Sequence, residues 1–391
     1  MSAETLRAGR RVYLDHAATT PVDARVLAAM LPYFSEKFGN PNSPHAFGRE
    51  AVTAVDDARD TVAACIGAKP SEIYFTSGGT EADNWALAGT MRANAERGRH
   101  FIVSAVEHHA VLEAARALCK EGFACSVAPV DGAGRVDVAA LKGLLRPDTV
   151  LVCLMAANNE VGTVQPLAEV SALCRGRGIL LFSDAVQAAG TLPVNVNSPR
   201  VDLLSLSSHK LYGPKGAGAL YVRSGVKIAP LLFGGRQERG RRGGTVNVPA
   251  CVGFAGALRL CAAEREREHA RLFALRERFA RQVLAGTDAL RNGDAKHSLP
   301  GVVSFTFDGT DGEAVLYALD LAGVAASGGA ACSSGAPEPS QVLLAMGRSE
   351  AQARASVRFS FGRENTEEDA DFAAETVIQT IQKLRARRAE E

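Results

Sequence analysis

Short apolar runs alternate with helix-like segments through the first two thirds of this chain, and this alternation limits the folds open to it. The runs are continuously apolar, which is typical of strands covered on both faces. Helix-like segments such as Glu81–Ala95, Ala110–Glu121 and Pro166–Arg177 lie between them. The predicted strands are Glu72–Phe75, His100–Ser104, Ser126–Pro129, Val150–Ala156, Ile179–Ser183, Leu203–Leu206 and Ala219–Val222. This pattern predicts an α/β fold with a mostly parallel sheet.

The sequence changes character near residue 260. Glu264–Leu284 is heavily charged, but its apolar residues recur at helical spacing, which predicts a long helix leading into a second domain. Val302–Phe307 and Val357–Phe361 alternate between apolar and polar residues, and this predicts a half-exposed antiparallel sheet. A final helix is predicted to begin near Thr366, where Thr-Glu-Glu-Asp resembles a capping box.

The charge balance argues against some partners. The chain has 44 Lys and Arg against 43 Asp and Glu, so no overall charge attracts nucleic acid or an anionic membrane. No apolar run approaches the roughly 18 residues of a membrane span, and the N-terminus lacks the apolar core of a secretory signal. None of the eight cysteines forms a C-x-x-C pair, which argues against a metal site such as zinc. We expect a cytoplasmic protein with reduced thiols.

Lys210 and Asp184 carry the strongest chemical signal. Lys210 lies in the polar stretch Ser207–Lys210, and Asp184 ends an apolar run 26 residues earlier. Pyridoxal phosphate needs a lysine amine for covalent attachment and an acid beside its pyridine nitrogen, so the pair predicts this cofactor. A helix N-cap is the alternative for Asp184, and Lys215 competes with Lys210. However, Lys215 lies in a turn-rich stretch that is typical of a solvated lysine.

A Gly-Gly turn at Thr76–Glu81 is predicted to hold the phosphate. It follows a strand and opens a helix, so Gly79 permits close backbone approach and Thr80 can donate to a phosphate oxygen. Many such turns have no ligand, and the missing G-K-[ST] sequence excludes a P-loop. Ser207 and His209 are further candidates for the phosphate.

Polar residues also follow two other predicted strands. His108 comes after the strand that ends near Ser104, where a histidine can stack on a flat ring and transfer protons. A surface or structural histidine is the alternative. Asn158-Asn159-Glu160 follow the most apolar strand, and Gln187 lies three residues after Asp184. All these side chains are expected at the sheet edge where the strands end.

Cys332 is the candidate nucleophile. Residues 325–335 are almost all small, which predicts a mobile loop and an exposed thiol, with an incidental surface thiol as the alternative. Arg358, on a predicted strand, has a guanidinium able to clamp a substrate carboxylate, and an ordinary ion pair is its alternative. The arginines between Arg236 and Arg242 lack the interleaved aromatic residues of a nucleic-acid site, so a subunit contact or an anion site fits them better.

Ordered motifs along nearly the whole chain resemble the cysteine desulfurases of the NifS/IscS type, within the class V aminotransferase group of pyridoxal phosphate enzymes. The motifs are Tyr13–Pro21, Phe38–Ser43, Thr76–Asn84, Asn158–Gly162, Asp184–Gln187, Glu338–Ser340 and Arg358–Arg363. The resemblance implies the type I fold of pyridoxal phosphate-dependent transferases, with a mostly parallel seven-stranded sheet. It also implies a large cofactor-binding domain of residues 16–262. A smaller α+β domain of residues 1–15 and 263–391 would carry the mobile Cys332 loop.

The same resemblance implies roles for single residues. Lys210 would attach the cofactor, Asp184 would pair with the pyridine nitrogen, and His108 would stack on the ring and move protons. The phosphate would be held by Gly79, Thr80, Ser207 and His209, and by Thr245 of the other subunit of a homodimer. Asn159 and Gln187 would lie near the ring hydroxyl, and Asn159 and Arg358 would bind the substrate.

The implied reaction converts L-cysteine to L-alanine and places the sulfur on Cys332 as a persulfide. An acceptor protein such as an iron–sulfur scaffold would then take the sulfur. The loop resembles the group I variety, although Gly328 and Ala330 replace serines usual there and Pro337 is added. A selenocysteine lyase or a small-substrate aminotransferase of the same fold is the alternative, and a cofactor-free binding protein is the alternative from another class.

Overall fold

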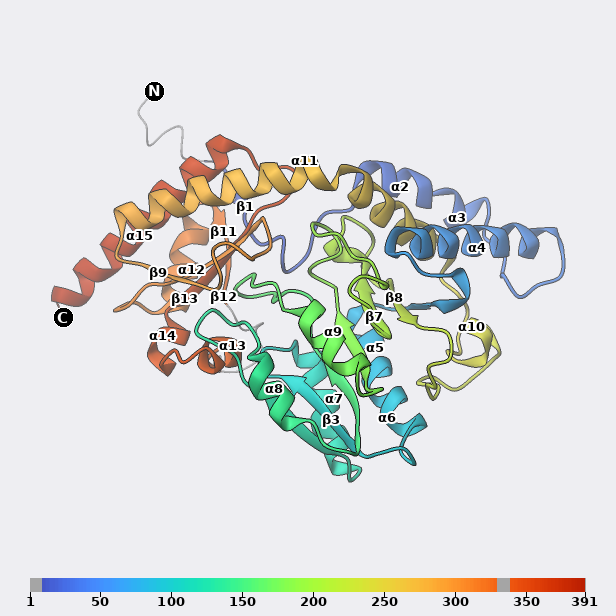
Figure 1. The fold of residues 1–391 in the computed structure, drawn as a ribbon. Helices are drawn as coiled ribbons and strands as arrows, with labels where there is room; N and C mark the ends of the chain where they lie inside the picture. The colour runs from blue at the N-terminus through green and yellow to red at the C-terminus, as the bar shows by residue number, and fades with distance from the viewer. Residues whose placement is uncertain (1–8, 329–337, 391) are drawn as a thin grey trace.

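A seven-stranded sheet dominates the computed structural model, which describes residues 9–328 and 338–390 (Figure 1). Its strands are β2 (Ile73–Thr76), β3 (His100–Ser104), β4 (Ala124–Ala128), β5 (Thr149–Cys153), β6 (Leu180–Asp184), β7 (Leu203–Ser207) and β8 (Gly218–Val222), in the order β2-β8-β7-β6-β5-β3-β4. Strands β7, β6, β5, β3 and β4 are parallel, and β8 is antiparallel to β7 and to β2. The predicted mostly parallel seven-stranded sheet is therefore confirmed.

Helices cover both faces of this sheet, and neighbouring strand residues face opposite sides. Ile102 belongs to the core cluster that also contains residues of α4 (Ala46–Ile66), α8 (Val138–Leu144) and α9 (Leu167–Arg175). Phe101 and Val103 pack on the other side with helices from two segments. These are α5 (Gly79–Asn84) with the π-helix Trp85–Gly89 and α6 (Thr90–Ala93), and α7 (His109–Lys120). Burial on both faces explains why the strands are continuously apolar.

A second, antiparallel sheet has the order β12-β13-β10-β9. Its strands are β9 (Leu290–Asn292), β10 (Val302–Thr306), β12 (Ser327–Gly328) and β13 (Ser356–Ser360). The N-terminal strand β1 (Val12–Tyr13) lies beside it and pairs in parallel with β11 (Val324–Ala325). The antiparallel arrangement is as predicted, but the predicted half-exposed face is wrong, because every residue of β10 and β13 is buried. The polar side chains bond one another instead: Thr306 Oγ1 lies 2.7 Å from Ser356 Oγ and accepts from Asn292 Nδ2 at 2.9 Å.

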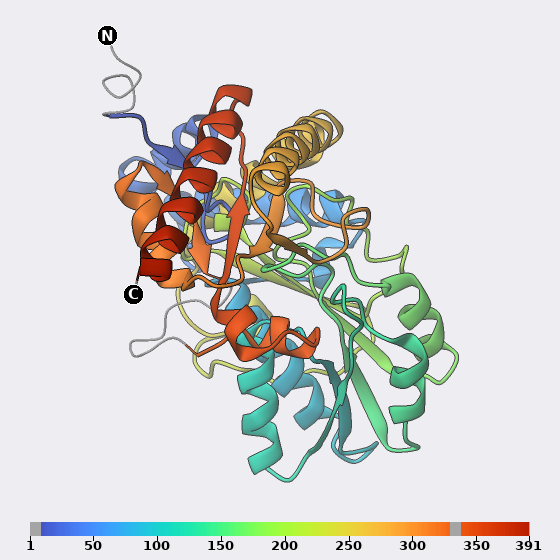
Figure 2. The ribbon, with the colours of Figure 1, turned by 90° about the vertical axis from the view of Figure 1, so that its left-hand side faces the viewer.

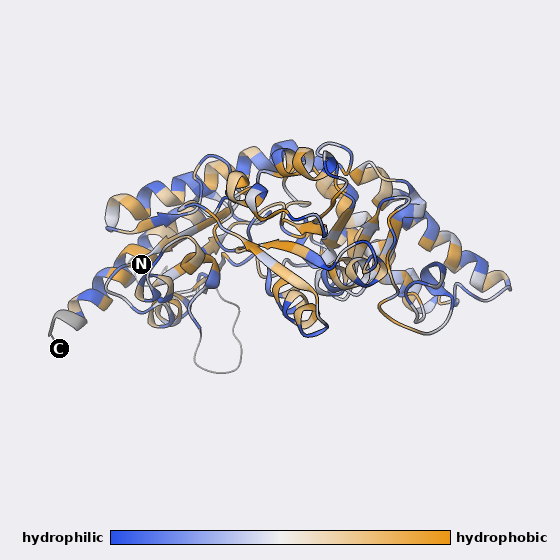
Figure 3. Cartoon of the chain, turned by 60° about the horizontal axis from the view of Figure 1, so that its bottom comes forward, coloured by the Kyte–Doolittle hydropathy of each residue, from blue (hydrophilic) through white to orange (hydrophobic). Residues whose placement is uncertain are grey.

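The long helix α11 (Val248–Gly286) begins well before the predicted Glu264 and contacts the cores of both sheets. In its first half, Phe254 and Leu258 pack into the large core, and in its second half Phe279 packs into the small one. Figures 1 and 2 show α11 running from α4 to the side of the last helix, α15 (Glu367–Glu390). In Figure 3 the outer helices alternate between hydrophilic and hydrophobic residues, whereas the central strands are mostly hydrophobic.

Shorter helices complete the fold. They are α2 (Ala24–Met30), α3 (Pro32–Ser35), α10 (Gln237–Gly240), α12 (Gly312–Leu321), α13 (Gln341–Ala345) and α14 (Glu350–Arg354), with 3-10 turns at Pro70–Glu72 and Ser208–Lys210. Within residues 9–328 and 338–390, no helix has an apolar stretch long enough to cross a bilayer. The same residues contain no group of three or more His, Cys, Asp or Glu side chains placed to hold a metal ion.

Candidate active site

A cavity of about 320 Å³ lies where the parallel strands of the large sheet end, next to the small sheet. Polar residues from the loops after β2, β3, β5, β6 and β7 line it, and β12 and β13 close one side. The sequence-predicted residues that it brings together are Gly79, Thr80, His108, Asn159, Asp184, Gln187, Ser207, His209, Lys210 and Arg358. The carboxyl edge of an open α/β sheet is the expected place for a ligand site, and the predicted side chains line the cavity at this edge.

Lys210 ends the 3-10 turn that follows β7, and its amine points to the N-terminal segment. Nζ donates to the carbonyl oxygens of Ala17 at 2.6 Å and Ala18 at 2.7 Å. Burial and, to a smaller extent, the Arg358 charge lower the pKa of Lys210 to about 8, against the opposing charges of Asp15 and Asp184. A larger share of this amine is therefore neutral, and so nucleophilic, at neutral pH than for a solvated lysine.

Asp184 ends β6 and is buried. Its Oδ1 accepts a hydrogen bond from the Val186 amide at 2.8 Å. Burial raises the pKa of Asp184, whereas this hydrogen bond and the nearby His108 and Lys210 charges oppose the rise. A buried carboxyl group near the side chains of His108 and Lys210 is suited to pair with a protonated ring nitrogen.

His108 is the N-cap of α7 and also faces the cavity. Its Nδ1 accepts from the Ala110 amide at 3.1 Å, so the neutral ring carries its proton on Nε2. Burial lowers the pKa of His108, which keeps the ring neutral at working pH. The structure therefore leaves Nε2 as the atom through which this ring exchanges a proton.

The turn before α5 forms the phosphate end of the cavity. Gly78 has φ +156°, and no side chain caps the helix, so its first amides are free to bind an anion. A Cβ on Gly79 would lie only 2.8 Å from a methyl group of Val186, so a larger residue at this position would require the Val186 side chain to shift. Thr80 and Ser207 add hydroxyl groups to the same wall.

Arg358 approaches the cavity from β13. Its Nη1 donates to the Asn159 carbonyl at 2.9 Å and its Nη2 to Asp15 Oδ1 at 2.8 Å. Its Nε is buried and has no hydrogen-bond partner among the described residues. A buried guanidinium with a spare N–H suits a small carboxylate ligand. On the opposite side, Gln187 Nε2 donates to the Ala17 carbonyl at 2.9 Å.

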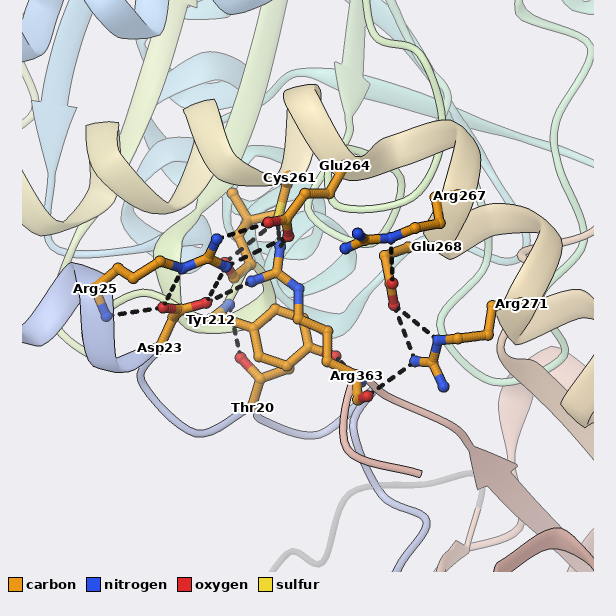
Figure 4. Close-up of polar contacts among 11 residues, drawn as sticks. Thr20, Asp23, Arg25, Tyr212, Cys261, Glu264, Arg267, Glu268, Arg271 and Arg363 are labelled. Atoms are coloured by element: carbon orange, nitrogen blue, oxygen red, sulfur yellow. Dashed lines mark hydrogen bonds and ion pairs between the residues drawn. The ribbon is translucent and has the colours of Figure 1, made fainter. Parts of the chain in front are cut away.

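A polar network holds the lysine loop in place (Figure 4). Thr20 Oγ1 donates to the His209 carbonyl at 2.9 Å and accepts from the Tyr212 amide at 2.8 Å. The Arg363 amide donates to the Tyr212 hydroxyl at 2.8 Å, and the Arg363 guanidinium lies 4.4 Å from the centre of the same ring. Asp23 in turn accepts from Arg363 Nη1 at 2.8 Å. The network joins the N-terminal segment, the Lys210 loop and the small sheet around the cavity.

One predicted site residue, Thr245, is absent from the lining of this cavity, and another, Cys332, lies outside the described residues. Thr245 is exposed and lies outside it, in the loop after α10, where the resemblance expects it to serve the other subunit. Cys332 and its neighbours 329–337 lie outside the described residues. The competing Lys215 is exposed, as expected for a solvated loop lysine.

Sequence reasoning missed one acidic residue of the cavity wall and one acidic neighbour of that wall. Asp83 lines the cavity, and its Oδ1 is 2.5 Å from Ser205 Oγ, next to Asp184 in the sheet register. Asp83 lies four residues after Gly79, one helical turn beyond the phosphate turn, and that spacing is the signal that identifies it. Asp15, the ion-pair partner of Arg358, lies in the Tyr13–Pro21 motif, just after β1.

These residues fit pyridoxal phosphate. The Gly79 turn excludes a side chain from the anion end, and Lys210 and Asp184 share the cavity as the amine and the acid that this cofactor requires. Arg358 lines the same cavity, and its buried Nε has no hydrogen-bond partner among the described residues, so this guanidinium is the candidate for binding a carboxylate.

Comparison with known proteins identifies the family of this chain. The family model "Aminotransferase class-V" matches residues 12–372. A cysteine desulfurase IscS of Dictyoglomus turgidum is 48% identical over 377 residues and covers 96% of each chain. A putative cysteine desulfurase, IscS 1 of Bacillus subtilis, is 49% identical over 376 residues, or 96% of this chain and 99% of that protein. A solved structure described as a NifS-like protein has a TM-score of 0.90 and 38% identity, with 96% of this chain and all of that chain covered.

Proposed function

The chain belongs to the class V aminotransferase family, and from this premise we propose that it is a cysteine desulfurase that converts L-cysteine to L-alanine. One observation carries the proposal. Lys210, Asp184, His108 and Arg358 line a single cavity, which supplies an amine, an acid, a proton donor and a carboxylate anchor at one place. The family uses pyridoxal phosphate, and we propose that cofactor here because the cavity wall fits it.

The substrate is held by its carboxylate. Arg358 offers its free Nε, and Asn159 and Asp15 fix the other two guanidinium nitrogens, so the fork keeps one orientation. When bound, pyridoxal phosphate supplies an electron sink that makes the Cα proton and then the Cβ–S bond of cysteine labile. Lys210, with its lowered pKa, takes the Cα proton, and Asp184 stabilises positive charge at the far end of the cavity.

The sulfur leaves by attack of a thiolate. We propose that Cys332 attacks the substrate sulfur, so that a new S–S bond forms while the Cβ–S bond breaks. The electron pair of the broken bond stays on the substrate carbon, which takes a proton and leaves as the methyl group of alanine. His108 exchanges protons with the thiol through Nε2, because its Nδ1 already accepts from a backbone amide. An acceptor protein, such as an iron–sulfur scaffold, then removes the sulfur from Cys332.

We further propose a homodimer in the cytoplasm. Thr245 is exposed and outside the cavity of its own chain, which suits a residue that serves a second copy. Phe233 in the preceding loop is 89% exposed, and Phe34 on α3 is 61% exposed, so large apolar groups are open to a partner. All seven cysteines among the described residues are free, which suits a reducing compartment.

The decisive experiment compares the wild type with Cys332→Ser. Both proteins should bind the cofactor and show its colour, but only the wild type should release alanine from L-cysteine. Borohydride trapping and peptide mapping should place the cofactor label on Lys210. Alanine formation without a keto-acid acceptor separates this activity from an aminotransferase, and turnover of L-cysteine separates it from a selenocysteine lyase. Normal alanine production by the serine variant would contradict the nucleophile assignment.

A further inference from the structure

Two sequence motifs without a role so far meet inside the protein. Glu160 ends the Asn-Asn-Glu motif and directly follows Asn159 of the cavity wall, and Ser340 ends the Glu-Pro-Ser motif. Ser340 Oγ donates to Glu160 Oε2 at 2.5 Å, although 180 residues separate the two in the chain. Glu160 is 5% exposed and Ser340 is 4% exposed, so water does not compete for this hydrogen bond.

Ser340 uses its hydroxyl twice. It is the N-cap of α13, and its Oγ accepts from the Leu343 amide at 3.2 Å while it donates to Glu160. The first residue of α13, Gln341, donates from Nε2 to the Glu107 carbonyl at 3.2 Å, next to His108. The apolar residues that pack α13 against the active-site loops are Val342, Leu343 and Met346 on one side and Val106, Met155 and Val161 on the other. The start of α13 is therefore fixed to the loops that carry His108 and Asn159.

The position of Ser340 in the chain connects this hydrogen bond to Cys332. Ser340 lies eight residues after Cys332. On the other side, Ser327 and Gly328 line the cavity, and Ser327 pairs with Arg358 across β12 and β13. The chain thus leaves the described structure at the cavity wall and returns to it close to the same wall. The Glu160–Ser340 hydrogen bond fixes the point of return.

We propose that Glu160 is a positioning residue: through its hydrogen bond to Ser340 it fixes the chain on the C-terminal side of Cys332 and so sets how fast that thiol reaches the substrate sulfur. The inference rests on the proposed function, because it assumes Cys332 as the nucleophile. This buried hydrogen bond adds to the Gln341 contact and the apolar packing at the start of α13, and its loss should let the first residues of this helix sample other positions.

The charge of Glu160 and its hydrogen bond to Ser340 can be tested separately. Burial raises the pKa of Glu160 to about 7, while the Ser340 hydroxyl and the Arg358 charge oppose the rise. Both the neutral and the charged carboxyl can accept from Ser340. A glutamine at this position keeps an accepting oxygen and the same size, so it tests whether the charge matters.

The experiment uses the holoenzyme and four variants: Glu160→Ala, Glu160→Gln, Ser340→Ala and the control Ser349→Ala. Ser349 is the N-cap of the next five-residue helix, α14, and accepts from the Gln352 amide at 3.2 Å, but has no contact with Glu160. Three quantities are measured: the dissociation constant for L-cysteine from the cofactor absorbance, the single-turnover rate of alanine release, and hydrogen exchange of the amides 341–346.

We expect Glu160→Ala and Ser340→Ala to slow alanine release about tenfold while the dissociation constant changes less than about twofold. Amides 341–346 should exchange faster in both. The double variant should be no slower than either single one, because both remove the same bond. Glu160→Gln and Ser349→Ala should behave like the wild type.

Two results would overturn the proposal. If Ser340→Ala and Ser349→Ala slow alanine release equally, only helix capping matters. If Glu160→Gln is as slow as Glu160→Ala, the charge of Glu160 acts rather than its bond to Ser340. If Glu160→Ala does not fold, the two serine variants still decide the question. Failure of the proposed function is a separate outcome, because the wild type would then release no alanine from L-cysteine, or Cys332→Ser would still release it.

Discussion

The pKa of Lys210 makes a quantitative prediction about cofactor attachment. Only the neutral amine attacks an aldehyde, and at pH 7 an amine with a pKa of about 8 is roughly 9% neutral. A lysine at the ordinary value of 10.5 is about 0.03% neutral at that pH, so Lys210 should react roughly 300 times faster on this ground alone. The attachment rate should rise tenfold per pH unit below about pH 8 and level off above it.

Two charge variants should move this midpoint in opposite directions. Arg358 lowers the pKa of Lys210, so Arg358→Gln should raise the midpoint by roughly one pH unit. Asp15 raises the pKa of Lys210, so Asp15→Asn should lower it by a similar amount. The charges of the Arg358–Asp15 ion pair oppose each other at Lys210 in the wild type, and each substitution leaves the other charge uncompensated.

The assay mixes cofactor-free protein with pyridoxal phosphate between about pH 6 and about pH 10 and follows the absorbance of the attached cofactor. The reagent titrates identically for every variant, so differences between variants report the protein. Lys215→Ala is the matched control and should not change the curve, because Lys215 is exposed. A wild-type midpoint near the ordinary lysine value, or shifts of both variants in one direction, would refute the reasoning.

Three further outcomes are expected. Phe279→Ala should lower the free energy of unfolding in urea by about 3–5 kcal/mol, because this fully buried ring packs against Phe305 and Phe359; a loss below about 1 kcal/mol would contradict the packing. Burial raises the pKa of Glu107 to about 7 in the folded protein. The contribution of protonated Glu107 to the free energy of unfolding is therefore complete below about pH 4.5 and is lost as the pH rises through about 7. Glu107→Gln should therefore flatten the profile of melting temperature against pH in that range, and an unchanged profile would count against it. Phe233→Asp should shift the dimer towards monomers in sedimentation, whereas a wild type that is already monomeric would contradict the proposed assembly.

The large sheet and the catalytic cavity were predictable because each follows from a local pattern. Continuous apolar runs report burial on both faces, and the carboxyl ends of parallel strands meet at one edge. Asp184 and Lys210 could be placed there from the sequence alone, since Asp184 ends a strand and Lys210 ends the turn after the next strand. The small sheet misled the same logic. Polar residues at every second position indicate a solvent-exposed face only if they lack hydrogen-bond partners inside the protein. Thr306 has such partners in Asn292 and Ser356.

Contacts between distant segments were not predictable from periodicity. The 2.5 Å contacts of Asp83 with Ser205 and of Glu160 with Ser340 join residues 122 and 180 positions apart. Each of these residues occurs in an ordinary local context, so only the folded chain reveals the pair. The start of α11 was also missed, because its first half is apolar on the side that packs into the large core and carries few charges.

The 39 residues of α11 span about 58 Å and bury one stripe in each core. A cut in the gene at the boundary between the two sheets would divide α11. Each fragment would then expose apolar side chains that α11 normally buries, and neither would be a complete protein. A chimera that takes its smaller half from a relative should therefore keep α11 from a single protein, with the junction at Asn247 or at Thr287.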